Sequence, residues 1–63
     1  MFLYAKYAKL RDKKGLTDYK VAKETGIPRS TLYEWGRGMY EPKLDKIVKL
    51  AKFFGVPIEY FVE

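Results

Sequence analysis

The residues of this chain that could recognise another molecule by its chemistry lie in the short stretch after Pro28. Arg29 can donate two hydrogen bonds to the O6 and N7 atoms of guanine, a pairing worth about 1–3 kcal/mol of discrimination between bases. Glu34 can accept a hydrogen bond from cytosine N4, and Tyr33 can contact a thymine methyl group or a phosphate. Together with Ser30, these side chains predict base contacts in the major groove of double-stranded DNA.

Two apolar residues mark the buried side of the helix that would carry these side chains. Leu32 and Trp35 are three positions apart, so they share one helix face and are predicted to lie in the core. An α-helix turns about 100° per residue, which places the polar positions on the opposite face. The outward positions are Ser30, Tyr33, Glu34 and Arg37, with Arg29 at their N-terminal edge.

Some of these residues also fit a purely structural role, which the sequence leaves open. Tyr33 could cover exposed apolar surface instead of contacting DNA. Glu34 could pair with the guanidinium of Arg11 or Arg37. The lysines near the N-terminus are typical of the solvated face of an amphipathic helix. Arg29 is the strongest candidate, because an arginine in the first turn is disfavoured by the helix dipole and lacks a local partner.

Contacts to DNA phosphates are expected on either side of this helix. Thr17 precedes another predicted helix, whose N-terminal amides can bind a phosphate oxygen. Hydroxyl and basic side chains also occur in or just after the segment Gly36–Pro42. The predicted phosphate contacts in these two regions are Thr17, Arg37, Tyr40 and Lys43.

The residue spacing from Asp18 to Arg37 predicts a helix-turn-helix, the element that would position these side chains. Two short helices joined by a tight turn cross closely, and Ala22 supplies a small residue at their contact. The turn requires a positive φ, which Gly26 adopts without steric cost. Leu32 follows six residues later as the buried residue of the second helix.

Hydrophobic periodicity predicts an all-α protein, a compact bundle of five helices without strands, in one domain over residues 1–63. Caps and breakers divide the chain at glycine, proline and threonine positions. The first expected helix runs over Phe2–Lys14, with Leu3, Tyr7 and Leu10 on one stripe. The second runs from the N-cap Thr17 to about Gly26, and the third from Pro28 to the Gly36–Pro42 loop. The fourth ends at Gly55 and carries Leu44, Ile47, Val48, Ala51 and Phe54, and a short fifth helix follows Pro57.

The composition argues against several kinds of site. The chain has no cysteine and no histidine, so it forms no disulfide, and a zinc site would need carboxylates alone. Ser30 and Thr31 have no histidine to activate them as nucleophiles. We therefore expect no enzymatic activity, no metal, no cofactor and no small-molecule ligand.

The charge favours a polyanionic partner. The net charge is +5, and the first fourteen residues contain five basic residues and a single acid. A basic balance of this kind suits nucleic acid but does not require it. No apolar run is long enough to span a membrane or to form a signal peptide.

The sequence resembles the Cro/CI-type (XRE-like) helix-turn-helix domains of small phage repressors along nearly its whole length. The shared positions are Leu10-Arg11, Gly15-Leu16-Thr17, Val21-Ala22, Gly26-Ile27, Leu32, Trp35, Gly38, Pro42, Leu44, Ile47, Leu50-Ala51, Phe54, Gly55-Val56 and Phe61. The resemblance implies a lambda-repressor-like fold and a sequence-specific DNA-binding transcriptional regulator, with repressor as the expected activity. It also implies a cytoplasmic, nucleoid-associated protein of a prokaryote or phage.

Three positions depart from this family. Asp18 stands where the family commonly has a glutamine that resembles a phosphate clamp, and Tyr33 stands where it often has serine. Gly36 replaces a glutamate that commonly pairs with the arginine of the first helix. Arg11 is therefore expected to turn to Asp12, to Glu34 or to a DNA phosphate, and it is counted with the predicted phosphate contacts.

Selective DNA binding by so small a domain favours a homodimer on a two-fold operator. The expected dimer interface is the apolar surface at the C-terminus, formed by Phe53, Ile58, Tyr60, Phe61 and Val62. An alternative that the sequence leaves open is a protein-interaction module, such as an antitoxin that binds a partner protein and its own operator. The same C-terminal surface would then serve that partner.

Overall fold

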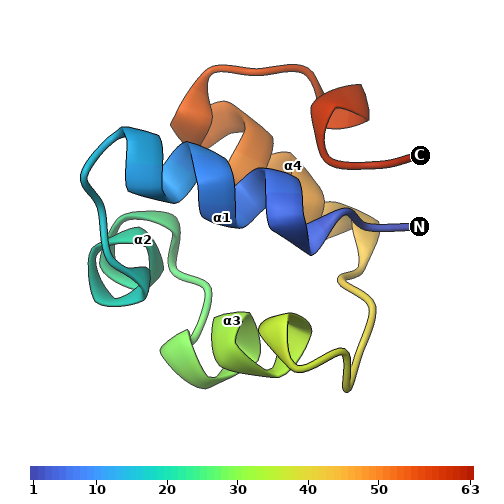
Figure 1. Cartoon of the computed structure of the whole chain (residues 1–63), viewed down its shortest axis with the longest axis horizontal. Coiled ribbons are helices and arrows are strands. Elements are labelled where there is room, and N and C mark those ends of the chain that lie inside the picture. Colours follow the sequence, from blue (N-terminus) through green and yellow to red (C-terminus); the bar gives the residue numbers. More distant parts are fainter.

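The computed structural model describes residues 1–63 as four α-helices and one turn of 3₁₀-helix. The elements in chain order are α1 (Tyr4–Lys13), α2 (Asp18–Thr25), α3 (Arg29–Gly36), α4 (Leu44–Phe54) and the 3₁₀ turn η1 (Ile58–Tyr60). Figure 1 shows α1 across the middle of the molecule, with η1 above it and α3 below. The two chain ends lie side by side at the same edge.

The prediction of a fifth helix is wrong, because the last segment forms only a three-residue 3₁₀ turn. Pro57 precedes this turn in an extended conformation. Beyond Tyr60 the chain enters a single antiparallel β-bridge between Val62 and Phe2. Since this backbone pairs with the N-terminus, it cannot also continue the hydrogen bonds of a helix.

The N-terminal residues Met1–Leu3, which we call the N-terminal strap, are extended rather than helical. The Leu3 N–H donates a hydrogen bond of 2.7 Å to the Phe61 carbonyl. Helix α1 therefore begins at Tyr4, two residues later than the sequence predicts. Because the strap is extended, Phe2 enters the core with 7% of its surface exposed, while Leu3 is only half-buried.

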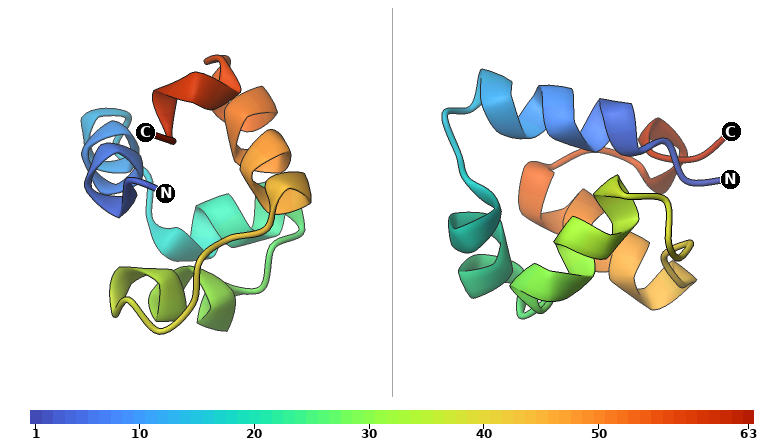
Figure 2. Two further views of the ribbon diagram at one scale, coloured as in Figure 1. Left: turned by 90° about the vertical axis from the view of Figure 1, so that its right-hand side faces the viewer. Right: turned by 60° about the horizontal axis from the view of Figure 1, so that its bottom comes forward.

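One apolar core fills the space between the helices, and none of its buried side chains is polar or charged. Its members are Phe2, Tyr7, Leu10, Val21, Ile27, Leu32, Trp35, Ile47, Leu50, Ala51, Phe54 and Phe61. The Phe2 ring lies 5.5 Å from that of Trp35 and 6.1 Å from that of Phe61, measured between centroids. Figure 2 shows from two further sides that the helices surround this interior. The two ring contacts of Phe2 link α3 to the C-terminal segment.

The predicted helix boundaries around the turn are confirmed. The Thr17 hydroxyl oxygen accepts a hydrogen bond of 3.2 Å from the Lys20 N–H, so Thr17 caps α2. Gly26 ends α2 with a φ of +80°, a conformation that costs a glycine little. Gly55 ends α4 in the same left-handed region. The longest helix has 11 residues, and none is long and apolar enough to cross a membrane.

The buried position of Phe2 predicts that shortening different side chains of the strap to alanine lowers the free energy of unfolding by different amounts. We expect Phe2→Ala to lower the free energy of unfolding by about 3–5 kcal/mol, because it removes a buried aromatic ring and leaves a cavity. The matched Leu3→Ala variant should cost roughly 1 kcal/mol, because Leu3 is half-buried. Thermal and urea unfolding monitored by circular dichroism measures both. Equal losses would show that the strap does not anchor the fold through Phe2.

Candidate nucleic-acid interface

Helix α3 has a buried and an exposed face, as the sequence predicts. Leu32 has no exposed surface and Trp35 keeps 5% of its own, which confirms both as core residues. Arg29 and Ser30 in the first turn are exposed, and so is Tyr33, at 58%. The right-hand view of Figure 2, with the lower side turned forward, shows α3 in front of the other helices on this side. The outer face of α3 is thus free to contact a partner.

The side chains of Tyr33 and Arg37 contact each other on this face, four residues apart. Arg37 Nη1 donates a hydrogen bond of 3.0 Å to the Tyr33 hydroxyl oxygen, and its guanidinium carbon lies 5.7 Å from the ring centroid. An arginine over a tyrosine ring is attracted by the negative face of the ring. The two residues therefore present a phenol and a guanidinium together at the C-terminal end of the exposed face.

Glu34 is the least accessible of the predicted base-contact residues. It is half-buried, whereas Arg29, Ser30 and Tyr33 are exposed. None of the ion pairs in the protein includes its carboxylate, so it pairs with no arginine. The carboxylate remains available to accept a hydrogen bond, but only from a group that reaches the flank of α3.

The carboxylate of Asp18, the first residue of α2, is bound by two side chains of α1. Its Oδ1 accepts a hydrogen bond of 2.6 Å from the Tyr7 hydroxyl and one of 2.9 Å from Arg11 Nη1. The Arg11 Nε donates another hydrogen bond, of 3.0 Å, to Asp12. Hydrogen bonds that involve a charged group are about twice as strong as neutral ones. Tyr7, Arg11 and Asp18 thus form a polar cluster that fastens the start of α2 to α1.

The pKa values of this cluster follow from its burial and charges. Burial raises the pKa of the Tyr7 phenol well above its ordinary value, and the hydrogen bond to the Asp18 carboxylate raises it further. Burial lowers the pKa of Arg11, but its hydrogen bonds to Asp12 and Asp18 outweigh that effect and raise it overall. Tyr7 therefore stays a neutral donor and Arg11 stays a cation across the working range of a protein.

This cluster changes how the charge of Asp18 at the start of α2 would affect a nearby DNA phosphate. A free carboxylate here would repel a DNA phosphate, but Asp18 faces Arg11 and is only 25% exposed. Thr17 keeps its hydroxyl at the helix start, and the first amides of α2 point out of that end. Arg11 is held by two carboxylates with its side chain 19% exposed, so the structure accounts for its charge without DNA.

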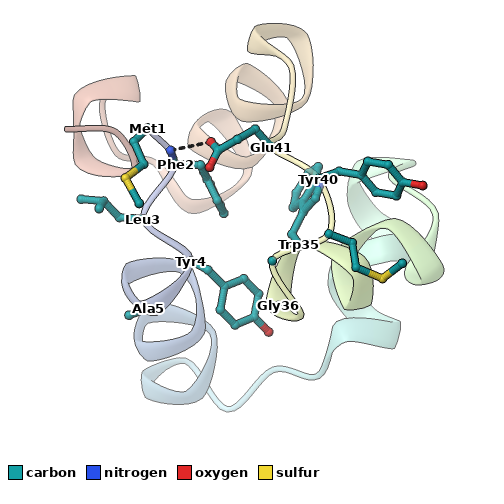
Figure 3. Close-up of a pocket in the computed structure, with 11 residues that line it drawn as sticks. Met1, Phe2, Leu3, Tyr4, Ala5, Trp35, Gly36, Tyr40 and Glu41 are labelled. Atoms are coloured by element: carbon teal, nitrogen blue, oxygen red, sulfur yellow. Dashed lines mark hydrogen bonds between the residues drawn. The ribbon is translucent and has the colours of Figure 1, made fainter.

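The loop between α3 and α4 carries the other predicted phosphate-contact residues. Arg37, Tyr40 and Lys43 are all exposed. Glu41 in the same loop has a structural role, because its Oε2 accepts the Phe2 N–H at 2.9 Å. Figure 3 shows this hydrogen bond between the loop and the N-terminal strap. The strap thus braces the loop that follows the exposed helix.

A cavity of about 500 Å³ lies between the N-terminal strap and this loop. Figure 3 shows the rings of Phe2, Tyr4 and Trp35 around it. Glu41 is the only charged side chain in its lining, and one of its oxygens is already bonded to the strap. The Glu41 carboxylate therefore makes a polar contact across a cavity whose lining is otherwise mostly apolar.

Tyr4 explains why a glycine occupies the last position of α3. A Cβ added at Gly36 would lie 2.9 Å from both Cζ and Oη of Tyr4, closer than real contacts allow. Tyr4 is packed against the core, so its ring fills the space beside the end of α3.

The expected dimer surface needs one correction. Phe61 has no exposed surface, because its ring packs against Phe2 and Phe54 in the core. It therefore cannot contact a second copy of this fold. Partly exposed surface remains on the other members of the set, which are Phe53, Ile58, Tyr60 and Val62.

The sequence reasoning missed two residues that support the exposed face of α3, Tyr7 and Glu41. Tyr7 is predicted only as part of an apolar stripe, although a buried tyrosine needs a partner for its hydroxyl, and that requirement was a usable signal. Glu41 gave no local signal, because its partner lies 39 residues away in the chain. Tyr7 is buried and positions α2, whereas Glu41 is exposed and positions the loop through its hydrogen bond to the strap.

Two short helices joined at a left-handed glycine, the second with a buried apolar face and a polar outer face, define a helix-turn-helix domain. The comparison with protein families agrees with this class. The family model described as Helix-turn-helix matches residues 8–61. The chain belongs to this family and is a Cro/CI-type member of it.

Proteins named as transcriptional repressors or regulators are similar in sequence to this chain. The chain is 38% identical over 58 residues to the cryptic phage CTXphi transcriptional repressor RstR of Vibrio cholerae, an alignment that covers 92% of this chain and 52% of RstR. It is 46% identical over 44 residues to an uncharacterized HTH-type transcriptional regulator of Methanocaldococcus jannaschii, covering 70% of this chain and 67% of the relative. The chain thus spans about half the length of RstR.

The Tyr7 hydrogen bond predicts a stability difference that depends on pH. Tyr7→Phe should lower the free energy of unfolding by about 1.5–3 kcal/mol at neutral pH, because it removes a hydrogen bond to a charged group. The unfolded chain releases the Tyr7 proton near pH 10, while the folded chain still holds it. The stabilisation is therefore complete below about pH 10 and is lost as the pH rises further.

Urea titrations of the wild type and of Tyr7→Phe from pH 7 to 11 measure this effect. The difference between the two proteins should shrink above about pH 10. Tyr19→Phe is the matched control, since Tyr19 is 60% exposed. A difference that stays constant over the whole range would contradict the assigned role of Tyr7.

The close contact between Tyr4 and Gly36 predicts that the effect of one substitution depends on the other residue. In the wild type, Gly36→Ala forces the far end of the Tyr4 ring to shift, because its Cζ and Oη lie 2.9 Å from the added Cβ, and this cost offsets the ~0.5–1 kcal/mol that alanine gains over glycine in a helix. In a Tyr4→Ala background the same substitution should be neutral or stabilising. A double-mutant cycle from thermal unfolding measures the coupling, and additive effects would disprove the contact.

Proposed function

We propose that this protein is a sequence-specific double-stranded DNA-binding transcriptional regulator that reads the major groove with α3. The observation that carries the proposal is the outer face of α3, where Arg29, Ser30 and Tyr33 are exposed above a fully buried Leu32. The N-terminal part of such a helix reaches base edges when the helix lies in the groove. Family membership supports the same class of activity.

Within this function, Arg29 is the main base-reading residue and the flanking residues position the domain. Ser30, Tyr33 and Glu34 complete the base contacts, with Glu34 confined to the flank of α3. Phosphate contacts come from Thr17 with the first amides of α2, and from Arg37, Tyr40 and Lys43 after α3. Arg11 acts at the phosphates only indirectly, since it neutralises Asp18 at the start of α2.

The activity we propose is repression by a homodimer on a two-fold operator. The printed name of the relative RstR is that of a transcriptional repressor, which supports this choice. One module buries only roughly 600–1,000 Å² of its surface on DNA, which favours a second copy for selective binding. The two copies would meet through Phe53, Ile58, Tyr60 and Val62, and their half-sites would lie about one helical turn apart.

Selection from random duplex DNA, followed by titration of the enriched site, tests the proposed function. We expect an inverted repeat that the wild type binds at least a thousandfold more tightly than a scrambled duplex. If about six phosphates are neutralised, log affinity should fall with log salt with a slope near −5. Enrichment of no site, with equal weak binding to both duplexes, would overturn the proposal.

Arg29 variants then test the base-reading assignment on the selected site. Arg29→Ala should weaken binding by about 1–3 kcal/mol and relax the preference at one base pair of each half-site. Arg29→Lys should keep the charge but lose much of that preference, because lysine cannot donate a planar bidentate pair. Lys52→Ala, on the exposed side of α4, is the control for loss of one charge. Unchanged base preference in Arg29→Ala would disprove the assignment.

A further inference from the structure

A second groove lies between α1 and η1 and combines a cationic rim with apolar walls. It has a volume of about 450 Å³. Its lining consists of Ala5, Lys6, Lys9, Leu10, Lys13 and Tyr60. The Lys6 Nζ lies 5.1 Å from the centroid of the Tyr60 ring, so the aromatic wall and the first lysine are already in contact. We call these six residues the α1–η1 groove.

The three lysines of this groove have no anionic partner within the protein. The only ion pairs are those of Arg11 with Asp12 and with Asp18, and that of Lys20 with Glu24. Lys6, Lys9 and Lys13 repeat at three- and four-residue intervals, so they share one side of α1 and point along the same groove. Three like charges held in a row lower the free energy of any bound anion between them.

The groove faces away from the proposed DNA-reading surface. In Figure 1 and in the left view of Figure 2, η1 lies at the top of the molecule and α3 at the bottom. The groove lysines turn toward η1, because Tyr60 of η1 lines the same cavity. A partner bound here would therefore leave the outer face of α3 free.

We propose that the α1–η1 groove binds an acidic segment of a partner protein, with carboxylates on the three lysines and an apolar side chain against Tyr60 and Leu10. The charges match, because the groove offers three cations and no carboxylate in its lining. The cavity also matches, because 450 Å³ between an aromatic ring and aliphatic side chains accommodates an apolar anchor. The proposal adds a binding surface to the regulator that is separate from its DNA contacts and shares Tyr60 with the proposed dimer contact.

An acidic protein segment fits this groove better than a second DNA duplex. A duplex carries its charge uniformly along the backbone and has no apolar side group to fill the space beside Tyr60. Its charge would also extend past the groove onto η1, which carries the exposed Glu59 and no basic residue. A short segment with a few carboxylates can bind the lysines without approaching that acid.

Fluorescence anisotropy with a defined peptide tests the proposal on the full 63-residue chain. The probe is a fluorescein-labelled 12-residue peptide in which glutamates flank a central Leu-Phe pair. The test variant combines Lys6→Gln, Lys9→Gln and Lys13→Gln. The control combines Lys23→Gln, Lys49→Gln and Lys52→Gln, which removes the same charge from exposed positions outside the outer face of α3 and the α1–η1 groove. Circular dichroism verifies that both variants fold.

We expect the test variant to bind the peptide roughly tenfold more weakly than the wild type, and the control to change its affinity less than about twofold. A peptide with glutamine in place of glutamate, or alanine in place of the Leu-Phe pair, should also bind more weakly. Amide chemical shifts should move in Lys6–Lys13 and Ile58–Tyr60 rather than in α3. These shifts locate the site even if the affinity is low.

Three results would overturn the proposal. Equal weakening in both triple variants would show that net charge alone attracts the peptide. Shift changes in α2 and α3 would show that the peptide occupies the DNA-reading surface instead. A random 16-base-pair duplex whose binding weakens only in the test variant would assign the groove to nucleic acid. Failure of the wild type to select any DNA site would count against the proposed function and would leave this result unaffected.

Discussion

The carboxylate of Asp18 is the polar centre on which the arrangement of the first three helices depends. It receives the Tyr7 hydroxyl at 2.6 Å and an Arg11 nitrogen at 2.9 Å, and so joins the start of α2 to the middle of α1. Charge-assisted hydrogen bonds of this length are strong and directional. Because α2 is held at its first residue, the position from which it packs against α3 across the Gly26 turn is fixed. The same contact neutralises the charge of Asp18 at the end of α2 where we propose that a DNA phosphate binds.

A second constraint holds α3 from the opposite end. The ring of Tyr4 fills the space beside Gly36, and the ring of Phe2 packs against Trp35 on the buried side of α3. Glu41 ties the following loop to the N-terminal strap. These contacts join the two chain ends and the loop into one support for a helix of only eight residues. A helix this short is marginal on its own, so its outer side chains are placed by tertiary packing rather than by its own propensity.

The two charged surfaces of the molecule differ in what they offer. The outer face of α3 mixes two arginines, hydroxyl groups and one carboxylate, a set suited to reading a pattern of donors and acceptors. The α1–η1 groove is a row of lysines beside an aromatic ring, a set suited to an anion with an apolar neighbour. The two surfaces lie on opposite sides of the molecule. The groove shares Tyr60 with the proposed dimer contact, so an acidic segment bound there would meet the dimer surface rather than the outer face of α3.

Features that depend on near neighbours in the chain could be predicted from the sequence. The α2 cap at Thr17, the left-handed Gly26 and the inward face of Leu32 and Trp35 all follow from spacings of a few residues. Tertiary structure alone decided the end of the chain, where a predicted fifth helix became a 3₁₀ turn and Phe61 became a core residue rather than dimer surface. It also decided the partners of Asp18 and Glu41. The reason is that helix periods and caps are local, whereas a β-bridge or the hydrogen bonds of a carboxylate depend on which distant segment supplies the complementary group.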